Sequence, residues 1–357
     1  MRNLNQFELS MNPIYLDYNA TTPIDPEVAE AMRPYLEEHF GNPSSSHWYG
    51  MQTKQAVVQA RTQVAELLNC QPEEIVFTSG GSESNNFAIK GIAFTHRERG
   101  NHIITSAVEH PAVIEVCKFL ENSGFRVTYL PVDEFGIIDL EQLKNAITPQ
   151  TTLISIMHAN NEVGSIQPIA KISEIAKAND IFLHTDAAQS IGKIATDVTE
   201  MDVDLLSIAG HKMYAHKGIG ALYIRNGTQL QKLIHGAGHE HGWRAGTENV
   251  LQIAGLGRAC EIAKRNLAKT QKTTQETRDR LQKGLFENLD NLRLTGHPKQ
   301  RLPNTLSIGF ANIKANQLLD EMPGIAASAG AACHSDSVNI SATLAAMQIP
   351  MEYAMGT

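Results

Sequence analysis

The sequence lacks the features that mark disulfide-rich, metal-thiolate and membrane proteins. Its 357 residues include only four cysteines, which lie far apart and form no CxxC pair, so neither a disulfide framework nor a cysteine-rich zinc site is indicated. No apolar run reaches the roughly 18 residues of a membrane span, and residues 1–10 have no signal-peptide core. We therefore expect a soluble, cytoplasmic protein with reduced thiols and no membrane contact.

Positive charge is also scarce. The formal net charge is −8, whereas nucleic-acid binding needs clustered Lys and Arg to neutralise phosphates. We expect no nucleic-acid partner. With 42% hydrophobic and 19% charged residues and no low-complexity tract, the composition is that of a globular protein. The length exceeds what one core usually serves and predicts about two domains.

Between about residues 75 and 225, short apolar runs alternate with helix-like stretches. Strands separated by helices predict a largely parallel sheet covered on both faces. Ligands of such sheets bind beyond the carboxyl ends of the strands. The expected strands are Ile75–Ser79, His102–Ser106, Arg126–Val132, Leu153–Ala159, Ile181–Asp186, Leu205–Gly210 and Ile219–Ile224.

The pattern changes after Gly246. A long helix is predicted over roughly Glu248–Leu289, where Ala, Leu, Lys, Glu and Gln dominate. A strand-like run, Thr305–Phe310, follows, and Ile325–Cys333 is a stretch of small residues. These features predict a second, smaller α/β domain that carries a mobile loop.

One glycine-rich turn follows a predicted strand and opens a predicted helix. It reads Ser79-Gly80-Gly81-Ser82. Glycines let the backbone approach an anion, the serine hydroxyls can donate, and the helix N-terminus adds partial positive charge. The turn is a candidate phosphate site, although an ordinary strand-to-helix turn would use the same residues.

Three further side chains of interest are predicted at the same edge of the sheet. Asp186 ends a buried strand, where a carboxylate needs a cation such as a protonated pyridine, or else caps the next helix. Lys212 follows another strand in an apolar, glycine-flanked setting, where burial favours the neutral amine that attacks an aldehyde. His110 is a planar ring that can stack on a pyridine. Together with the turn, they predict a pyridoxal-phosphate site.

Cys333 stands among small residues, Ala327–Ser335, which are too small to bury it. An exposed thiol on a flexible loop can reach a cleft and attack as the thiolate. We interpret Cys70, Cys117 and Cys260, in helix-like apolar surroundings, as structural. The three histidines of the loop His235–His241 fit no standard zinc spacing, so we expect no metal.

These motifs together resemble those of class V, fold-type I pyridoxal-phosphate enzymes, and most closely the cysteine desulfurases. The resemblance runs from Ile14 to the last residue. It rests on Tyr15–Pro23, Gly41–Ser45, Thr78–Asn86, Glu109-His110, Asn160–Gly164, Asp186 with Gln189, Gly210–Lys212, Arg244–Asn249 and the Cys333 loop.

The resemblance implies a role for each matching residue. Lys212 would carry pyridoxal 5'-phosphate covalently and move protons, His110 would stack on the ring and handle protons, and Cys333 would accept sulfur. The residues implied to bind the cofactor are Gly81, Ser82, His110, Asn161, Asp186, Gln189, His211 and Lys212, with Thr247 reaching the phosphate of the neighbouring subunit in a homodimer.

The resemblance also implies the reaction. Sulfur would pass from L-cysteine to Cys333 as a persulfide, leave L-alanine, and go on to acceptor or iron–sulfur scaffold proteins. The expected architecture is a large cofactor-binding domain, 15–262, with a seven-stranded mostly parallel sheet, and a small α/β domain of 1–14 and 263–357 that is shorter than in the family. A selenocysteine lyase, or a weakly active or non-catalytic scaffold, are the alternative interpretations.

Several positions depart from the family pattern. Ala209 replaces a usual serine and removes a phosphate-binding hydroxyl, so cofactor affinity is expected to fall. His216 and His241 stand where the family has proline and arginine. No arginine follows Arg301, whereas the family clamps the substrate carboxylate with a later one. Losing that contact would cost about 2–5 kcal/mol of interaction free energy. This corresponds to a roughly 30-fold to several thousand-fold loss in cysteine binding or turnover, so we expect poor turnover unless another cation substitutes.

Overall fold

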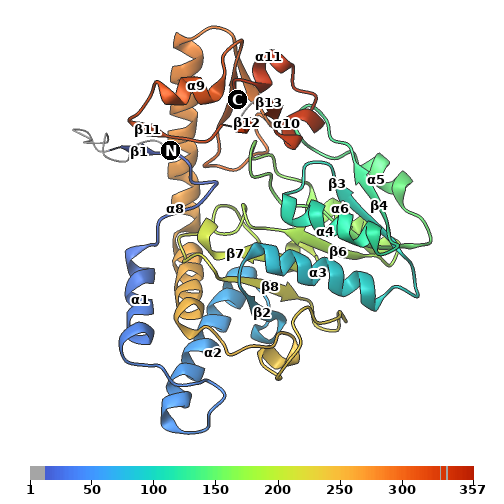
Figure 1. The fold of residues 1–357 in the computed structure, drawn as a ribbon, viewed down its shortest axis with the longest axis vertical. Helices are drawn as coiled ribbons and strands as arrows, with labels where there is room; N and C mark the ends of the chain where they lie inside the picture. The colour runs from blue at the N-terminus through green and yellow to red at the C-terminus, as the bar shows by residue number, and fades with distance from the viewer. Residues whose placement is uncertain (1–12, 330, 335–336) are drawn as a thin grey trace.

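The computed structural model describes residues 13–357 except 330 and 335–336 (Figure 1). Its centre is a seven-stranded sheet in the order β2-β8-β7-β6-β5-β3-β4. The strands are β2 (Ile75–Thr78), β3 (His102–Ser106), β4 (Arg126–Leu130), β5 (Thr151–Ser155), β6 (Phe182–Asp186), β7 (Leu205–Ala209) and β8 (Gly220–Ile224). All seven predicted strands are present, within a few residues of their expected bounds.

The sheet is mostly parallel, as predicted. The pairs formed by β3 with β4, β3 with β5, β5 with β6 and β6 with β7 are parallel. Only β8 is reversed, because it pairs antiparallel with both β2 and β7. The carboxyl ends of the other six strands therefore meet at one edge, where the candidate site residues follow them.

Successive side chains of the buried strands point to opposite faces of the sheet, so a hydrophobic core forms on each face. Ile104 and Ile154 pack on one face, whereas their neighbours Ile103 and Leu153 pack on the other. The first face is covered by helices α1 (Pro26–Glu37), α2 (Trp48–Leu68), α6 (Ile169–Ala178) and the start of α8 (Val250–Asn288); the second is covered by α3 (Gly81–Thr95) and α4 (Pro111–Asn122).

Helix α8 confirms the predicted long helix and links the two regions of the chain (Figure 1). Its first turns pack on the sheet through Ile253 and Leu256, which are buried. Its later turns run alongside the second region. That region contains β9 (Leu292–Thr295), β10 (Ser307–Phe310), α9 (Ala315–Asp320), β11 (Ile325–Ala326), α10 (Ala342–Ala346) and α11 (Met351–Ala354).

Short elements complete the described chain. Strand β1 (Ile14–Tyr15) pairs in parallel with β11, so the start of the described chain joins the second region. The remaining elements are α5 (Leu140–Ala146), α7 (Val198–Met201) and one-turn 3-10 helices at Pro72–Glu74, Gly210–Lys212 and Glu240–Gly242. Across the described ranges, no helix is both long and apolar enough to cross a membrane.

Cys333 lies in a strand rather than in the loop that we expected. Strands β12 (Ala331–His334) and β13 (Ser337–Ile340) form an antiparallel hairpin in which Cys333 pairs with Val338. The expectation of a loop was wrong for residues 331–334. The β-branched Val338 and Ile340 favour a paired strand, and the small residues before them did not reveal that partner.

Candidate active site

Lys212 lies in the one-turn helix that follows β7, at the carboxyl edge of the sheet. Its Nζ donates to the carbonyl oxygens of Asn19 (2.5 Å) and Ala20 (2.9 Å). Burial lowers the pKa of Lys212, while the carboxylates of Asp186 and Asp17 oppose that shift. The amine is therefore biased toward the neutral form that a nucleophile or base needs.

Gln189 and Asn161 are brought to Lys212 by Asn19. The amide Nε2 of Gln189 donates to the carbonyl of Asn19 at 2.8 Å, the same oxygen that accepts from Lys212. The side chain of Asn19 donates in turn to the carbonyl of Asn161 at 3.1 Å. Three predicted site residues thus share one hydrogen-bond network. Asn19 belongs to the Tyr15–Pro23 motif noted in the sequence. The sequence did not predict that Asn19 lies at the centre of this hydrogen-bond network.

Asp186 ends β6 and is 7% exposed. One carboxylate oxygen accepts from the amide of Asn85 at 2.7 Å, and the other accepts from the backbone N–H of Ala188 at 2.9 Å. The carboxylate therefore bonds the backbone of a turn. Residues 188–193 form turns and the next helix, α7, begins at Val198, so the interpretation of Asp186 as a helix cap was wrong. Asn85, which sequence reasoning missed, fixes its orientation. The other amide atom of Asn85, Oδ1, is buried without a partner among the described residues.

His110 caps the N-terminus of α4, where its Nδ1 accepts from the N–H of Ala112 at 3.1 Å. Burial lowers the pKa of His110; Lys212 adds to this shift and Asp186 opposes it. The charges of Asp186 and Lys212 therefore act on the His110 ring in opposite directions. With Nδ1 as an acceptor, the proton of the neutral ring lies on Nε2.

A cavity of about 400 Å³ opens beside this group. It contains three predicted phosphate-site residues, Gly81, Ser82 and His211, of which His211 lies 3.2 Å from the hydroxyl of Thr21 through Nδ1. The cavity is lined by Ala20, Thr21, Ser79, Gly80, Gly81, Ser82, Glu83, His211, Lys217, Gly218 and Ile219. One of them, Lys217, is a cation that sequence reasoning did not assign to the site.

The backbone of the turn is shaped for an anion. Gly80 has a backbone φ of 146°, a value that residues with a side chain rarely adopt. Helix α3 begins at the next residue, Gly81. The first N–H groups of a helix have no intrahelical acceptor. They are available here beside Ser82 and Lys217, so the cavity can bind a phosphate group. A Cβ added to Gly81 would lie 3.2 Å from the Cβ of Ala209.

Two predicted site residues are not brought into this group. Thr247 is exposed in the segment between β8 and α8 and does not line the cavity of its own chain. The backbone of Cys333 is in β12, but its side chain lies outside what the structure describes. Their roles remain predictions.

The other cysteines are poor nucleophiles. Cys117 and Cys260 are fully buried and Cys70 is partly buried. Burial raises the pKa of the Cys70 and Cys117 thiols to about 12, and raises that of Cys260 as well. Each therefore stays protonated near neutral pH. Within the described ranges, no group of three His, Cys, Asp or Glu side chains could hold a metal ion.

Comparison with known proteins identifies the family of the chain. Residues 14–355 match the family model for aminotransferase class-V. The chain is 49% identical over 346 residues to the cysteine desulfurase IscS of Dictyoglomus turgidum, covering 96% of this chain and 88% of the relative. Its fold is similar to the solved structure titled NifS-like protein, with TM-score 0.90, 38% identity and coverage of 96% and 92%. It is also similar to SspA in complex with cysteine, with TM-score 0.85, 38% identity and coverage of 96% of each chain.

Proposed function

The chain belongs to the class-V aminotransferase family, and we propose that it is a cysteine desulfurase that depends on pyridoxal 5'-phosphate. The proposal rests on one observation above all. Lys212 shares an acceptor with Gln189, and its one-turn helix also contributes His211 to the cavity beside the glycine turn, where we propose that the phosphate binds. Two relatives at 49% identity are named cysteine desulfurase IscS.

The residues present fit this cofactor. Gly81, Ser82 and His211 would hold its phosphate, with help from Lys217. Asp186 would bond the pyridine nitrogen, held in place by Asn85. Asn161 and Gln189 would contact the ring hydroxyl, His110 would stack on the ring, and Thr247 would reach the phosphate of a second subunit. Asp186 is buried, and a protonated ring nitrogen is the kind of cation that a buried carboxylate needs.

The remaining chemistry belongs to the chain's own side chains. When bound, the cofactor supplies an electron sink for the α-carbon of the substrate. Lys212, biased toward the neutral amine, would take the α-proton. The Cys333 thiolate would then attack the substrate sulfur: the carbon–sulfur bond of cysteine breaks and a sulfur–sulfur bond forms. Alanine leaves, and the sulfur stays on Cys333 as a persulfide, so no external oxidant is needed.

The wider assignment follows from this reaction. A persulfide is useful only if an acceptor collects it, so we infer that sulfur-acceptor or iron–sulfur scaffold proteins are partners. We propose a homodimer that shares Thr247 between subunits, a cytoplasmic location where thiols stay reduced, and a division into a large domain, 15–262, and a small domain of 1–14 and 263–357.

The direct test is spectroscopic and chemical. The purified chain, supplied with pyridoxal phosphate, should gain a visible absorbance band that survives gel filtration. It should then release alanine from L-cysteine in proportion to enzyme. A chain that stays colourless with added cofactor would contradict the proposal, as would one that binds cofactor but releases alanine from selenocysteine alone.

A further inference from the structure

The cavity of about 400 Å³ beside the glycine turn, which we call the phosphate cavity, has a carboxylate in its wall. Glu83 lines it, and the other ionisable lining side chains are Lys217 and His211. The Glu83 side chain is only 10% exposed, whereas Lys217 is exposed, so solvent screens the ammonium more than the carboxylate. Burial and the charges of the neighbouring lysines lower the pKa of His211 to about 4, so its ring is neutral. These three side chains alone would not favour a phosphate dianion.

Arg244 pairs with this carboxylate from outside the cavity lining. Its Nε donates to Glu83 Oε1 at 2.9 Å and its Nη2 donates to Oε2 at 3.3 Å, so one edge of the guanidinium faces both oxygens. The Oε2 atom also accepts from the backbone N–H of Ser79 at 2.7 Å. Burial raises the pKa of Glu83, but the bonds from Arg244 and Ser79 outweigh burial, and the pKa lies below its usual value. Glu83 is therefore ionised, and Arg244 neutralises its charge.

The segment between β8 and α8 is held in the shape that presents Arg244. Glu240 is 5% exposed and accepts from Arg61 Nη2 at 2.7 Å and from Arg61 Nη1 at 2.8 Å. It also accepts at 2.8 Å from the backbone N–H of Phe77, in the strand β2 that leads into the glycine turn. Glu240 and His241 have φ of 49° and 54°, which cost free energy in residues with a Cβ. The buried ion pair therefore fixes a backbone shape that the segment would not otherwise favour.

We propose that Arg244 is a positioning residue for the cofactor phosphate, because by neutralising Glu83 it allows the phosphate cavity to accept a dianion. The inference rests on the proposed function, since the phosphate concerned is that of pyridoxal 5'-phosphate. With the ion pair intact, the cavity offers the first N–H groups of α3, the Ser82 hydroxyl and Lys217. Without Arg244, the charge of Glu83 would act unopposed on the same phosphate, and like charges repel most strongly where water is excluded.

The test is equilibrium titration of the whole chain, freed of cofactor, with pyridoxal 5'-phosphate and separately with inorganic phosphate. We expect Arg244→Met to weaken both at least about tenfold, because it leaves an unpaired carboxylate beside a dianion. Glu83→Gln keeps an acceptor for the Ser79 N–H but removes the charge, so both should bind about threefold more tightly or better. The double variant has neither charge and should bind both within about threefold of wild type.

Pyridoxal separates charge from structure, because it has the same aldehyde as the cofactor but no phosphate. We expect its affinity to be unchanged in all three variants. Arg293→Met is the matched control: it removes an arginine from an ion pair with Glu134 on the surface, outside the lining of the phosphate cavity. It should leave every affinity unchanged.

Weaker binding of phosphate in both Arg244→Met and Glu83→Gln would overturn the inference, since the ion pair would then be structural. An equal loss of pyridoxal affinity in Arg244→Met would overturn it for the same reason. Unchanged affinities in Arg244→Met would overturn it and leave the proposed function intact, whereas a wild-type chain that binds neither pyridoxal phosphate nor phosphate would overturn both. If circular dichroism shows that Arg244→Met does not fold, Glu83→Gln still decides, because loss of charge predicts tighter binding and loss of a structural ion pair does not.

Discussion

At the scale of single residues, the positions of the candidate catalytic groups are set by neighbours without obvious chemistry. Lys193 is 9% exposed, and its Nζ donates to Gln189 Oε1 at 2.8 Å. Burial and the nearby charge of Lys212 lower the pKa of Lys193 to about 7. Because Lys193 occupies the oxygen of the Gln189 amide, the nitrogen end must face Asn19 and Lys212. Lys193 thus positions Gln189.

Replacing Lys212 should abolish covalent cofactor binding. We expect Lys212→Ala to lose the visible band after gel filtration and to show no desulfurase turnover, because Lys212 is the amine at the centre of the Asn19 network. Borohydride reduction followed by peptide mass spectrometry checks the linkage. Lys217→Ala, which removes the lysine that lines the phosphate cavity, should keep the covalent link. A reduced cofactor label that persists in Lys212→Ala would show that another amine is used.

Restoring a hydroxyl at position 209 should tighten cofactor binding. The Cβ of Ala209 lies beside the glycine turn, since a Cβ on Gly81 would approach it to 3.2 Å. A serine hydroxyl there can donate to a bound phosphate, and one hydrogen bond to a charged group is worth about 1.5 kcal/mol, or about tenfold. Equilibrium titration of the apoprotein with pyridoxal phosphate should show Ala209→Ser binding about ten times more tightly than wild type. Unchanged or weaker affinity would mean that residue 209 does not face the phosphate.

At the scale of elements, the central strands of the sheet carry buried polar side chains that control stability. His184 lies on β6 between two hydroxyls, with Nδ1 2.8 Å from Ser155 on β5 and Nε2 3.0 Å from Ser207 on β7. Burial lowers the pKa of His184 from about 6.5 to about 3. The ring is therefore neutral in the folded protein and ties three neighbouring strands together.

This shift predicts a pH-dependent stability. The folded pKa of His184 is depressed, so its contribution is complete above the unfolded value of about 6.5 and is lost as pH falls toward 3. In that window the unfolded chain binds one more proton at His184 than the folded chain does. The free energy of unfolding therefore falls by about 1.4 kcal/mol for each pH unit. We expect urea unfolding at pH 7.5, 6.0 and about 5.0 to show that the unfolding free energy of His184→Gln falls less steeply with decreasing pH than that of wild type. The difference in slope should be about 1.4 kcal/mol per pH unit below the unfolded pKa. Parallel curves would contradict a neutral, buried His184.

The strands and the long helix were predictable from the sequence because each signal is local. Runs such as Leu205–Ala209 are mostly apolar on both faces, which is typical of a central parallel strand, and the positions of these runs placed Asp186 and Lys212 at one edge. The contact that organises the site is not local. Asn19 bonds Lys212 across 193 positions and Thr305 across 286, and no spacing or propensity encodes such pairs.

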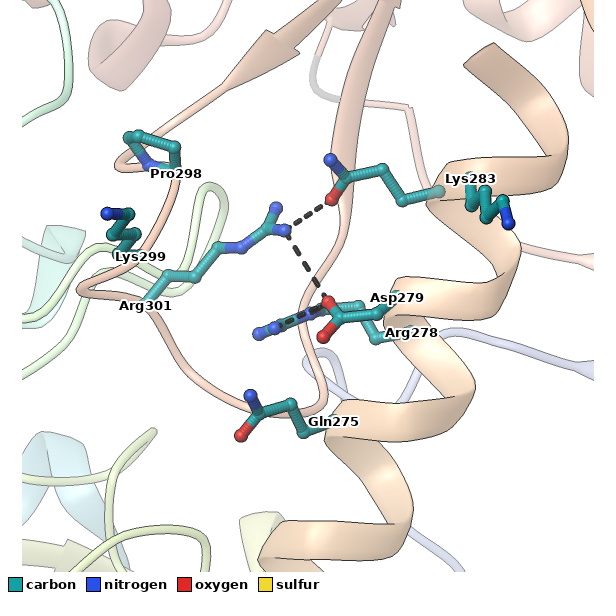
Figure 2. Close-up of a pocket in the computed structure, with 8 residues that line it drawn as sticks. Gln275, Arg278, Asp279, Lys283, Pro298, Lys299 and Arg301 are labelled. Carbon is teal, nitrogen blue, oxygen red and sulfur yellow. Dashed lines mark hydrogen bonds and ion pairs between the residues drawn. The ribbon is translucent and has the colours of Figure 1, made fainter. Parts of the chain in front are cut away.

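The same limit applies to the hairpin and to Arg301. The sequence around Cys333 indicated a loop because its residues are small, whereas pairing with Val338 makes it a strand. Arg301 looked like an ordinary charged residue before a proline. Only the packing of α8 against the segment after β9 (Figure 2) showed that two of its donors are buried and have no hydrogen-bond partner among the described residues.

At the scale of the whole molecule, an aromatic cluster stands exposed at one end. Phe40, Trp48 and Tyr49, at the α1–α2 connection, are 81%, 62% and 37% exposed. The rings of Trp48 and Tyr49 stack with centroids 3.6 Å apart, and Phe40 contacts Tyr49 at 5.2 Å. Exposed apolar groups gathered in this way mark an interaction surface, and we propose that the homodimer covers it.

Introducing a charge there should break the dimer. We expect the wild-type chain to sediment as a dimer and Phe40→Glu to shift toward monomer with at least about a tenfold weaker association, because burying an unpaired carboxylate in an apolar interface is costly. Phe119→Glu places the same charge at a partly exposed phenylalanine on α4 and should stay dimeric. Analytical ultracentrifugation over a concentration series checks both. A Phe40→Glu variant as dimeric as wild type would place the interface elsewhere.

The central claim is that this chain moves sulfur from cysteine to Cys333, and it can be tested on the protein itself. The cofactor-loaded chain is given L-cysteine without reductant, quenched with an alkylating agent, digested and analysed by peptide mass spectrometry. We predict one added sulfur atom on the peptide that contains Cys333, none on those with Cys70, Cys117 or Cys260, and loss of the label in Cys333→Ser with cofactor binding intact. Sulfur on another cysteine, or alanine release that continues in Cys333→Ser, would contradict the assignment.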